Sequence, residues 1–460
     1  MIFRLKRKFK IGGNFSKVID RNIHKTDNNA FVKRMALMVF ASGGIIAGLY
    51  NGAVSLFVFV VIALYLVSTC EIQNAYEVLF FLVPFANVFK LAYGTPSLVT
   101  ALQLVLLFRL FFLSRSITLS KCSFALGIVF ALYCIVRTPT QIVTILLFSI
   151  NVLFLLSSTM KGLSDHIRIG KIIIAFSLAI IMAAMYNFLK EYIAPLGKYI
   201  TDTLYRLEDQ TALDRLSGLY ENPNYFSIDI TIAMAGMYCA YMRRDVSARI
   251  FYSFEIILLA LGIMTQSTTF TITLMVFEIW VVFSMLRNKP YELGKVAIFL
   301  AIIFILCAPI LHKTILPYLT RFADKVEVLA EGGNVNEFST DRVSLWKYYL
   351  SDMDKDASIL LFGKGYGAVY ISDMRAYDSH NAFIQMLYCF GIVGSIIYIS
   401  FFLSIIHFRK RNGSKAYSSI FIIVLLVRCL TANIAVYDNL FYYVVIAYLL
   451  QQEPMEYATI

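Results

Sequence analysis

Residues 171–189 read KIIIAFSLAIIMAAMYNFL, an apolar run in which Lys171 is the only charged residue. A helix needs about 20 mostly apolar residues to cross the hydrocarbon core of a bilayer, so this stretch is long enough for one membrane-spanning helix. Runs of the same kind recur along the chain, and the same length criterion gives about fourteen of them, in a range of roughly 12–14. The sequence therefore predicts an all-α polytopic membrane protein.

The composition of the whole chain supports the membrane class. Of the 460 residues, 59% are hydrophobic and 15% are charged, whereas a soluble domain is about 25% charged. The net charge of +12 needs no nucleic acid to explain it, because lysine and arginine are attracted to anionic lipids at a membrane surface. We therefore expect the lipid bilayer as a partner and no nucleic acid.

The predicted spans differ in strength. The weakest is Glu77–Lys90, because Pro84 interrupts it and favours a re-entrant or half-buried helix. The full set of predicted spans is Met35–Tyr50, Ala53–Thr69, Glu77–Lys90, Pro96–Leu113, Cys122–Val136, Thr140–Ser158, Lys171–Leu189, Phe226–Tyr241, Ile250–Gln266, Thr268–Leu286, Lys295–Leu311, Asn381–Phe408, Ser418–Ala435 and Leu440–Leu450.

The charges between the spans predict how the chain is threaded. The first 34 residues carry ten lysines and arginines and lead into Met35–Tyr50 without a small-residue cleavage motif, which is typical of an uncleaved signal-anchor. With this arm in the cytoplasm, the basic clusters fall on the inner side, where positively charged loops belong. We therefore predict a basic arm over 1–34, a single membrane domain over 35–460, and outer loops over 190–225 and 312–380 that pack on the bundle.

Two patterns in the second outer loop resemble ligand sites without meeting their requirements. The glycines of Gly363-Lys-Gly365-Tyr-Gly367 lack the strand–loop–helix context of a nucleotide-binding loop, so they predict a tight turn beside a sugar or phosphate, or a plain turn. The alternating aspartates that begin at Asp352 fail as a calcium loop, because Ala357 stands where glycine is required. No cysteine and histidine spacing suggests zinc. The sequence therefore predicts no metal and no cofactor.

Three polar residues of the outer loops are the candidates for chemistry. Arg215 and Arg342 each offer a planar fork of donors that matches phosphate, and such cations stabilise a departing diphosphate. His380 titrates near neutral pH and can accept a proton from an attacking hydroxyl, which is worth about 10²–10⁴ in rate. Each has a plainer interpretation as well. The arginines would cap loops or reach toward lipid headgroups, and His380 would cap a helix at the membrane interface.

Four further residues are candidates for substrate contacts. Arg428 lies near the middle of a predicted span, where a charge is costly and usually faces the bundle interior or a water-filled cavity. Asn224 ends an Asn-Pro-Asn turn, in which asparagine caps the free amides of the following span. Trp346 lies one turn from Arg342 on a predicted amphipathic helix, and Asn381 begins the next span.

Two blocks of residues carry a family resemblance. They are Arg215-x-x-Gly218-x-x-x-Asn222-Pro223-Asn224, and Asp341-Arg342-x-x-x-Trp346 followed by Phe362-Gly-x-Gly365-x-Gly367 and Ser379-His380-Asn381-x-x-x-Gln385. In this order, and each before a predicted span, they resemble the O-antigen polymerase/ligase superfamily of bacterial envelope glycosyltransferases. Thr231 stands 16 positions after Arg215, where some polymerases of this family carry glycine, so glycine spacing does not identify the subfamily.

The resemblance implies a GT-C type glycosyltransferase in the bacterial inner membrane, with a cytoplasmic N-terminus and an active site facing the periplasm. It implies undecaprenyl-diphosphate-linked oligosaccharides as donor and acceptor, no metal, and a polysaccharide chain-length regulator as a further partner. Arg215 and Arg342 would hold the donor diphosphate, and His380 would act near the acceptor hydroxyl. We therefore expect an O-antigen polymerase of lipopolysaccharide biosynthesis. The alternatives are a ligase that moves the glycan to lipid A–core or protein, and a lipid-linked oligosaccharide flippase.

Overall fold

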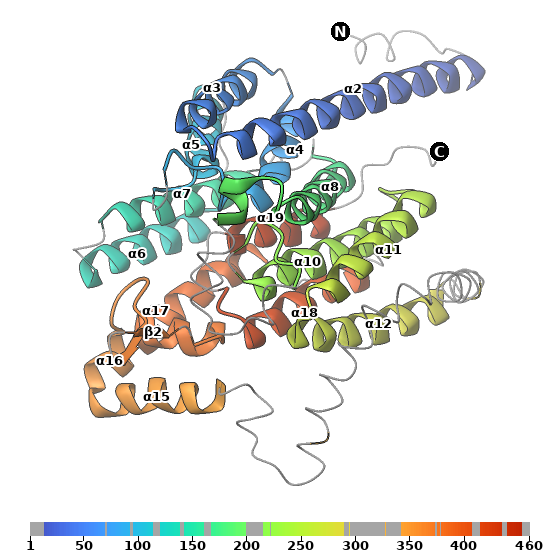
Figure 1. Ribbon diagram of the computed structural model, residues 1–460. Coiled ribbons are helices and arrows are strands. Elements are labelled where there is room, and N and C mark those ends of the chain that lie inside the picture. Colours follow the sequence, from blue (N-terminus) through green and yellow to red (C-terminus); the bar gives the residue numbers. More distant parts are fainter. Residues whose placement is uncertain are drawn as a thin grey trace.

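The computed structural model describes residues 13–69, 71–92, 95–113, 120–138, 142–160, 167–198, 215–220, 222–288, 294, 327, 342–372, 375–377, 379–406, 415–434 and 439–452. Helices make up most of these residues and gather in one bundle (Figure 1). The elements are α2 Gly13–Ala47, α3 Gly52–Ser68, α4 Ile72–Leu82, η1 Val83–Phe85, α5 Leu98–Leu113, α6 Lys121–Arg137, α7 Ile142–Ser158, α8 Ile169–Phe188, α10 Pro223–Met242, α11 Ala248–Met264, α12 Thr268–Asn288, α15 Arg342–Lys355, α16 Ala357–Phe362, β1 Tyr370–Ser372, β2 Arg375–Tyr377, α17 Ala382–Ile405, α18 Lys415–Thr431 and α19 Asn439–Gln451.

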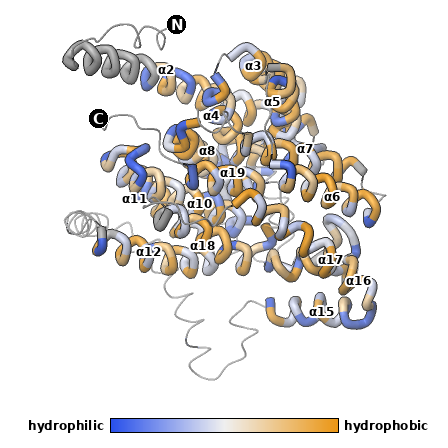
Figure 2. The backbone as a smooth tube through the Cα atoms, turned by 180° about the vertical axis from the view of Figure 1, so that it is seen from behind, coloured by the Kyte–Doolittle hydropathy of each residue, from blue (hydrophilic) through white to orange (hydrophobic). Residues whose placement is uncertain are grey.

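Among the described residues, three helices are long and apolar enough to cross a membrane. They are Asn28–Ala47 within α2, Ile169–Phe188 and Ala382–Ile405. Shorter apolar helices accompany them, namely Gly52–Ser68, Ile72–Phe85, Leu98–Phe112, Ile145–Ser158, Thr268–Ser284, Ser418–Thr431 and Asn439–Gln451. Figure 2 shows hydrophobic residues along most helices of the bundle, whereas α15 is more mixed. A mostly helical, apolar chain agrees with the predicted class, and the count of about fourteen spans stays a prediction.

The second predicted outer loop contains a small β-hairpin, which departs from the all-α prediction. Strands β1 and β2 pair antiparallel, with Tyr370 opposite Tyr377. Aromatic and β-branched residues such as these favour extended backbone. The predicted span Lys295–Leu311 lies outside the described residues, as do residues 199–214 and 328–341 of the predicted outer loops.

The described part of the predicted basic arm, residues 13–34, continues into the first predicted span as one helix. Helix α2 runs without interruption over Gly13–Ala47, so it passes through the expected boundary at residues 34 and 35. Figure 1 shows one end of α2 extending beyond the other helices. The physical reason is that no proline or helix-ending glycine separates the basic segment from the apolar one, so helical hydrogen bonding continues.

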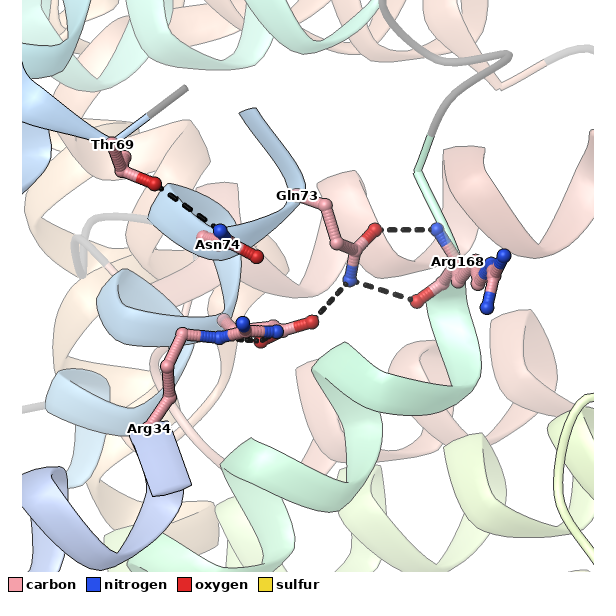
Figure 3. Close-up of polar contacts among 6 residues, drawn as sticks. Arg34, Thr69, Gln73, Asn74 and Arg168 are labelled. Atoms are coloured by element: carbon pink, nitrogen blue, oxygen red, sulfur yellow. Dashed lines mark hydrogen bonds and ion pairs between the residues drawn. The ribbon is translucent and has the colours of Figure 1, made fainter. Parts of the chain in front are cut away.

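A buried ion pair joins α2 to α4. Arg34 contacts the carboxylate of Glu77 at 2.7 Å, and the Glu77 side chain is fully buried. Gln73 donates to Glu77 at 2.9 Å and also pairs with the backbone of Arg168 at the start of α8 (Figure 3). Helix α4 then ends in the short 3₁₀ turn η1, which contains Pro84. The early stop agrees with the expectation that this segment is not a regular span.

Helix α10 occupies the centre of the bundle (Figure 1). It packs against α8, α11, α12, α18 and α19. Eighteen of its 20 residues are buried, as expected for a helix that is apolar on all sides. Asn222 accepts a hydrogen bond from the amide of Asn224, and Pro223 occupies the first turn, which confirms the predicted cap.

Helix α17 is broken at Gly391, where φ is +62°. The turn Gly363–Gly367, the glycine turn, packs into the break. Lys364 N and Gly365 N donate to the carbonyls of Tyr388 and Cys389 at 2.8 and 2.9 Å. A Cβ on Gly391 would lie 2.4 Å from the backbone of Leu361, so only glycine allows this approach. The glycine turn therefore satisfies helix carbonyls that the break leaves free.

Candidate functional site

Two candidate residues, in and just after the second predicted outer loop, meet at the C-terminal end of α18. Arg342 Nη1 donates to the carbonyl of Thr431 at 3.1 Å, and Asn381 Nδ2 donates to the carbonyl of Leu430 at 3.3 Å. The last carbonyls of a helix have no partner within the helix, so they accept readily from such donors. Helix α18 therefore positions the start of α15 and the start of α17 relative to each other.

Arg428 lies one turn below this end and is completely buried. Its guanidinium donates to the hydroxyls of Thr269, Thr273 and Ser227 and to the carbonyl of Asn224. All of these partners are neutral. Its Nε has no partner among the described residues, and none of their carboxylates forms an ion pair with it. A buried charge is costly unless it is paired, so this site favours an anion.

Asn224 connects Arg428 to Arg215. Its backbone carbonyl accepts from Arg428 at 3.0 Å, while its side-chain oxygen accepts from Arg215 Nη2 at 3.4 Å and from Ser267 at 2.7 Å. Arg215 also donates through Nε to the carbonyl of Thr265 at 3.0 Å. Arg215 is partly buried, and its two hydrogen bonds fix the orientation of the planar guanidinium.

His380 is held between two residues with fixed positions. Trp346 Nε1 donates to the carbonyl of Ser379 at 2.8 Å. Asn381 caps α17 by accepting from the amides of Phe383 and Ile384. His380 itself has φ of +50°, a left-handed conformation that costs roughly 1–2 kcal/mol in an L-residue. Strain of this kind is concentrated at functional sites and is maintained by the surrounding structure.

The structure therefore brings the predicted residues into one region. Arg215 and Arg428 each donate a hydrogen bond to Asn224. Arg342 and Asn381 both bind the end of α18, three residues or fewer from Arg428, and Arg342 lies close enough to interact with Arg428 electrostatically. Trp346 binds the carbonyl of Ser379, and Asn381 binds the end of α18. His380 lies between Ser379 and Asn381 in the sequence.

Sequence reasoning missed the hydroxyl groups beneath this region and a buried carboxylate beside it. Ser227, Thr269 and Thr273 hold Arg428, but serine and threonine are common in membrane helices and gave no distinctive signal. Asp229 lies in the middle of α10 and accepts hydrogen bonds from Tyr220 and Tyr443. A single carboxylate in an apolar run was the available signal for it.

A second polar contact fixes helix α15. Lys364 of the glycine turn pairs with Asp352 at 2.5 Å, and Tyr388 donates to the same carboxylate at 2.7 Å. Partial burial of Asp352 acts to raise its pKa, but the hydrogen bonds from Lys364 and Tyr388 outweigh burial and lower the pKa. Among the described residues, no group of three or more histidine, cysteine, aspartate or glutamate side chains could hold a metal ion.

Comparisons of the chain with models of protein families, with curated proteins and with solved structures gave no match. The resemblance to bacterial envelope glycosyltransferases therefore rests on the two blocks of residues quoted above. The geometry at the end of α18 is an independent observation, since it follows from the positions of Arg215, Arg342 and Arg428.

Proposed function

We propose that this protein is a glycosyltransferase that polymerises a bacterial surface polysaccharide of the O-antigen type. Its donor and acceptor are oligosaccharide repeat units linked to undecaprenyl diphosphate, and the reaction takes place at the periplasmic face of the inner membrane. The observation that carries the proposal is the gathering of Arg215, Arg342 and Arg428 around the end of α18, with the Arg428 charge buried among neutral partners.

The chemistry follows from the charges. A hydroxyl of the acceptor sugar attacks the anomeric carbon of the donor, and the bond from that carbon to the diphosphate oxygen breaks. The leaving diphosphate gains one negative charge, which guanidinium groups stabilise without a metal. His380 takes the proton from the attacking hydroxyl. The new glycosidic bond lengthens the chain by one unit at its reducing end.

Purified protein in lipid nanodiscs, supplied with a lipid-linked repeat unit, tests the proposal. Wild-type protein should form polymer, and Arg342→Ala should slow formation by about 10²–10³, the usual effect of removing one group that stabilises developing charge. Arg249→Ala is the matched control, because Arg249 is an exposed arginine at the start of α11. Equal rates for Arg342→Ala and wild type would contradict a catalytic role for the arginine region, which consists of Arg215, Arg342 and Arg428.

The products of the same assay separate the alternatives within the family. A polymerase extends one lipid-linked unit with another, so it needs no further acceptor. A ligase is inactive with lipid-linked units alone and transfers the glycan only when lipid A–core or an acceptor protein is added. If product forms only when lipid A–core or an acceptor protein is present, the protein is a ligase. The proposed chemistry at the donor would then be unchanged.

A lipid-linked oligosaccharide flippase is a second candidate because α17 is broken at Gly391. Discontinuous membrane helices form the substrate sites of many transporters. The test is movement of a fluorescent lipid-linked oligosaccharide across proteoliposomes. Transport that survives Arg342→Ala and His380→Ala, without any polymer, would favour the flippase.

A further inference from the structure

The proposed site has a buried carboxylate behind it that the chemistry above does not use. Asp229 of α10 is fully buried. One carboxylate oxygen accepts from the hydroxyl of Tyr443, on α19, and the other from that of Tyr220. Asn439 donates to the Tyr220 hydroxyl oxygen at 3.2 Å. The hydrogen bonds therefore run in one direction, from Asn439 through Tyr220 to Asp229.

The neighbours of Asp229 favour the ionised carboxylate. Each of its oxygens lies within hydrogen-bonding distance of one tyrosine hydroxyl, of Tyr220 or Tyr443. Donors that bond to a carboxylate stabilise its charged form. Arg428 is close enough to interact with Asp229 electrostatically, although the two do not form a direct ion pair.

We propose that Asp229 is a positioning residue that limits how tightly the arginine region holds the departing diphosphate. The inference rests on the proposed function. The product, a lipid diphosphate, carries one more negative charge than the donor, so a fixed carboxylate disfavours the product more than the donor. The three arginines stabilise the leaving group. The charge of Asp229 lowers their affinity for the lipid diphosphate product and so prevents product inhibition.

This role is tested by a variant that removes the charge of Asp229 and keeps the shape of the side chain. Asp229→Asn keeps the side chain's size and can still bond to both tyrosines, since a tyrosine hydroxyl can accept as well as donate. Tyr443→Phe is the matched control, because it removes one hydrogen bond from Asp229 and keeps the carboxyl group in place. Inorganic pyrophosphate is the probe, and its affinity for the full chain in nanodiscs is measured by calorimetry.

We expect Asp229→Asn to bind pyrophosphate about tenfold more tightly than wild type, the change that one unit charge produces over roughly 10 Å at an effective dielectric of about 20. Tyr443→Phe should stay close to wild type. In polymerisation, Asp229→Asn should lower KM and kcat together, because product leaves slowly. Weaker or unchanged pyrophosphate binding by Asp229→Asn would overturn the proposal, since a purely structural role predicts loss rather than gain.

A second variant keeps the test decisive if Asp229→Asn does not fold. Asn439→Asp adds a negative charge to the same hydrogen-bonded group, at the first turn of α19, where acidic residues are favourable. It should weaken pyrophosphate binding, and binding equal to or tighter than wild type would overturn the proposal. If pyrophosphate bound neither wild type nor any variant, the proposed diphosphate site itself would be wrong, and this inference would fall with it.

Discussion

Replacing Arg428 by methionine should remove activity while leaving the protein folded. The arginine is completely buried and its described partners are all neutral. Taking a single ion out of water costs several kcal/mol, and the loss of this cost in Arg428→Met offsets the loss of the hydrogen bonds of the guanidinium. For a residue that serves only structure, the loss of so many hydrogen bonds would instead destabilise the fold.

The partners of Arg428 decide the size of the effect. Thr273 also donates to the carbonyl of Thr269 at 2.8 Å, and Ser227 donates to the carbonyl of Asn224 at 2.7 Å. Thr269 pairs with Ser267 at 2.8 Å. Each hydroxyl therefore keeps a partner when the guanidinium is removed, so no new unsatisfied group adds its cost of about 1–3 kcal/mol.

We expect the free energy of unfolding of Arg428→Met to stay within about 1 kcal/mol of wild type. The polymerisation rate should fall by about 10²–10³, as for loss of one charge-stabilising group. Thermal unfolding in detergent and polymer formation in nanodiscs, on the same preparation, measure the two quantities. Destabilisation by 3 kcal/mol or more (roughly the cost of breaking a buried pair) would refute the reasoning, as would full activity.

Three other perturbations follow from the same contacts. Arg34→Ala should lower the free energy of unfolding by about 3–5 kcal/mol, because Glu77 stays buried without its partner; adding Glu77→Gln should recover part of the loss in a double-mutant cycle. His380→Gly should relieve left-handed strain and raise stability by roughly 1 kcal/mol, while polymerisation falls by about 10²–10⁴; undiminished activity would exclude His380 as the base. The pKa of Asp352 is lowered on folding, so its contribution to stability is present at neutral pH and is lost as the pH falls through the folded pKa. Unfolding temperatures measured below about pH 4 should therefore fall more steeply in wild type than in Asp352→Asn, and parallel curves would contradict this.

The helical architecture could be read from the sequence because burial in lipid leaves few choices. Every backbone group in an apolar environment needs an internal hydrogen bond, so long apolar runs become helices. The turn at Asn222–Asn224 was equally predictable, since its residues cap a helix by local chemistry alone. The continuity of α2 was not predicted, because a change from basic to apolar composition does not interrupt helical hydrogen bonding.

The sequence could supply candidate residues for the site but not their geometry. Arg215, Arg342 and His380 stand out by their chemistry within the predicted outer loops, but only the fold shows that Arg342 binds the end of α18 and that Arg215 reaches Arg428 of α18 through Asn224. The break at Gly391 escaped prediction because a glycine in a membrane helix is common and most cause no kink. Asp229 was overlooked for a related reason, since its meaning depends on two tyrosines distant in sequence.

The attachment of Arg342 and Asn381 to neighbouring carbonyls of α18 makes assembly of the site cooperative. Thr431 and Leu430 belong to the last turn of one helix, and helix ends open more easily than helix centres. If that turn unwinds, both donors are released in a single event rather than one after the other. The stability of this one turn therefore limits how long both segments stay docked together.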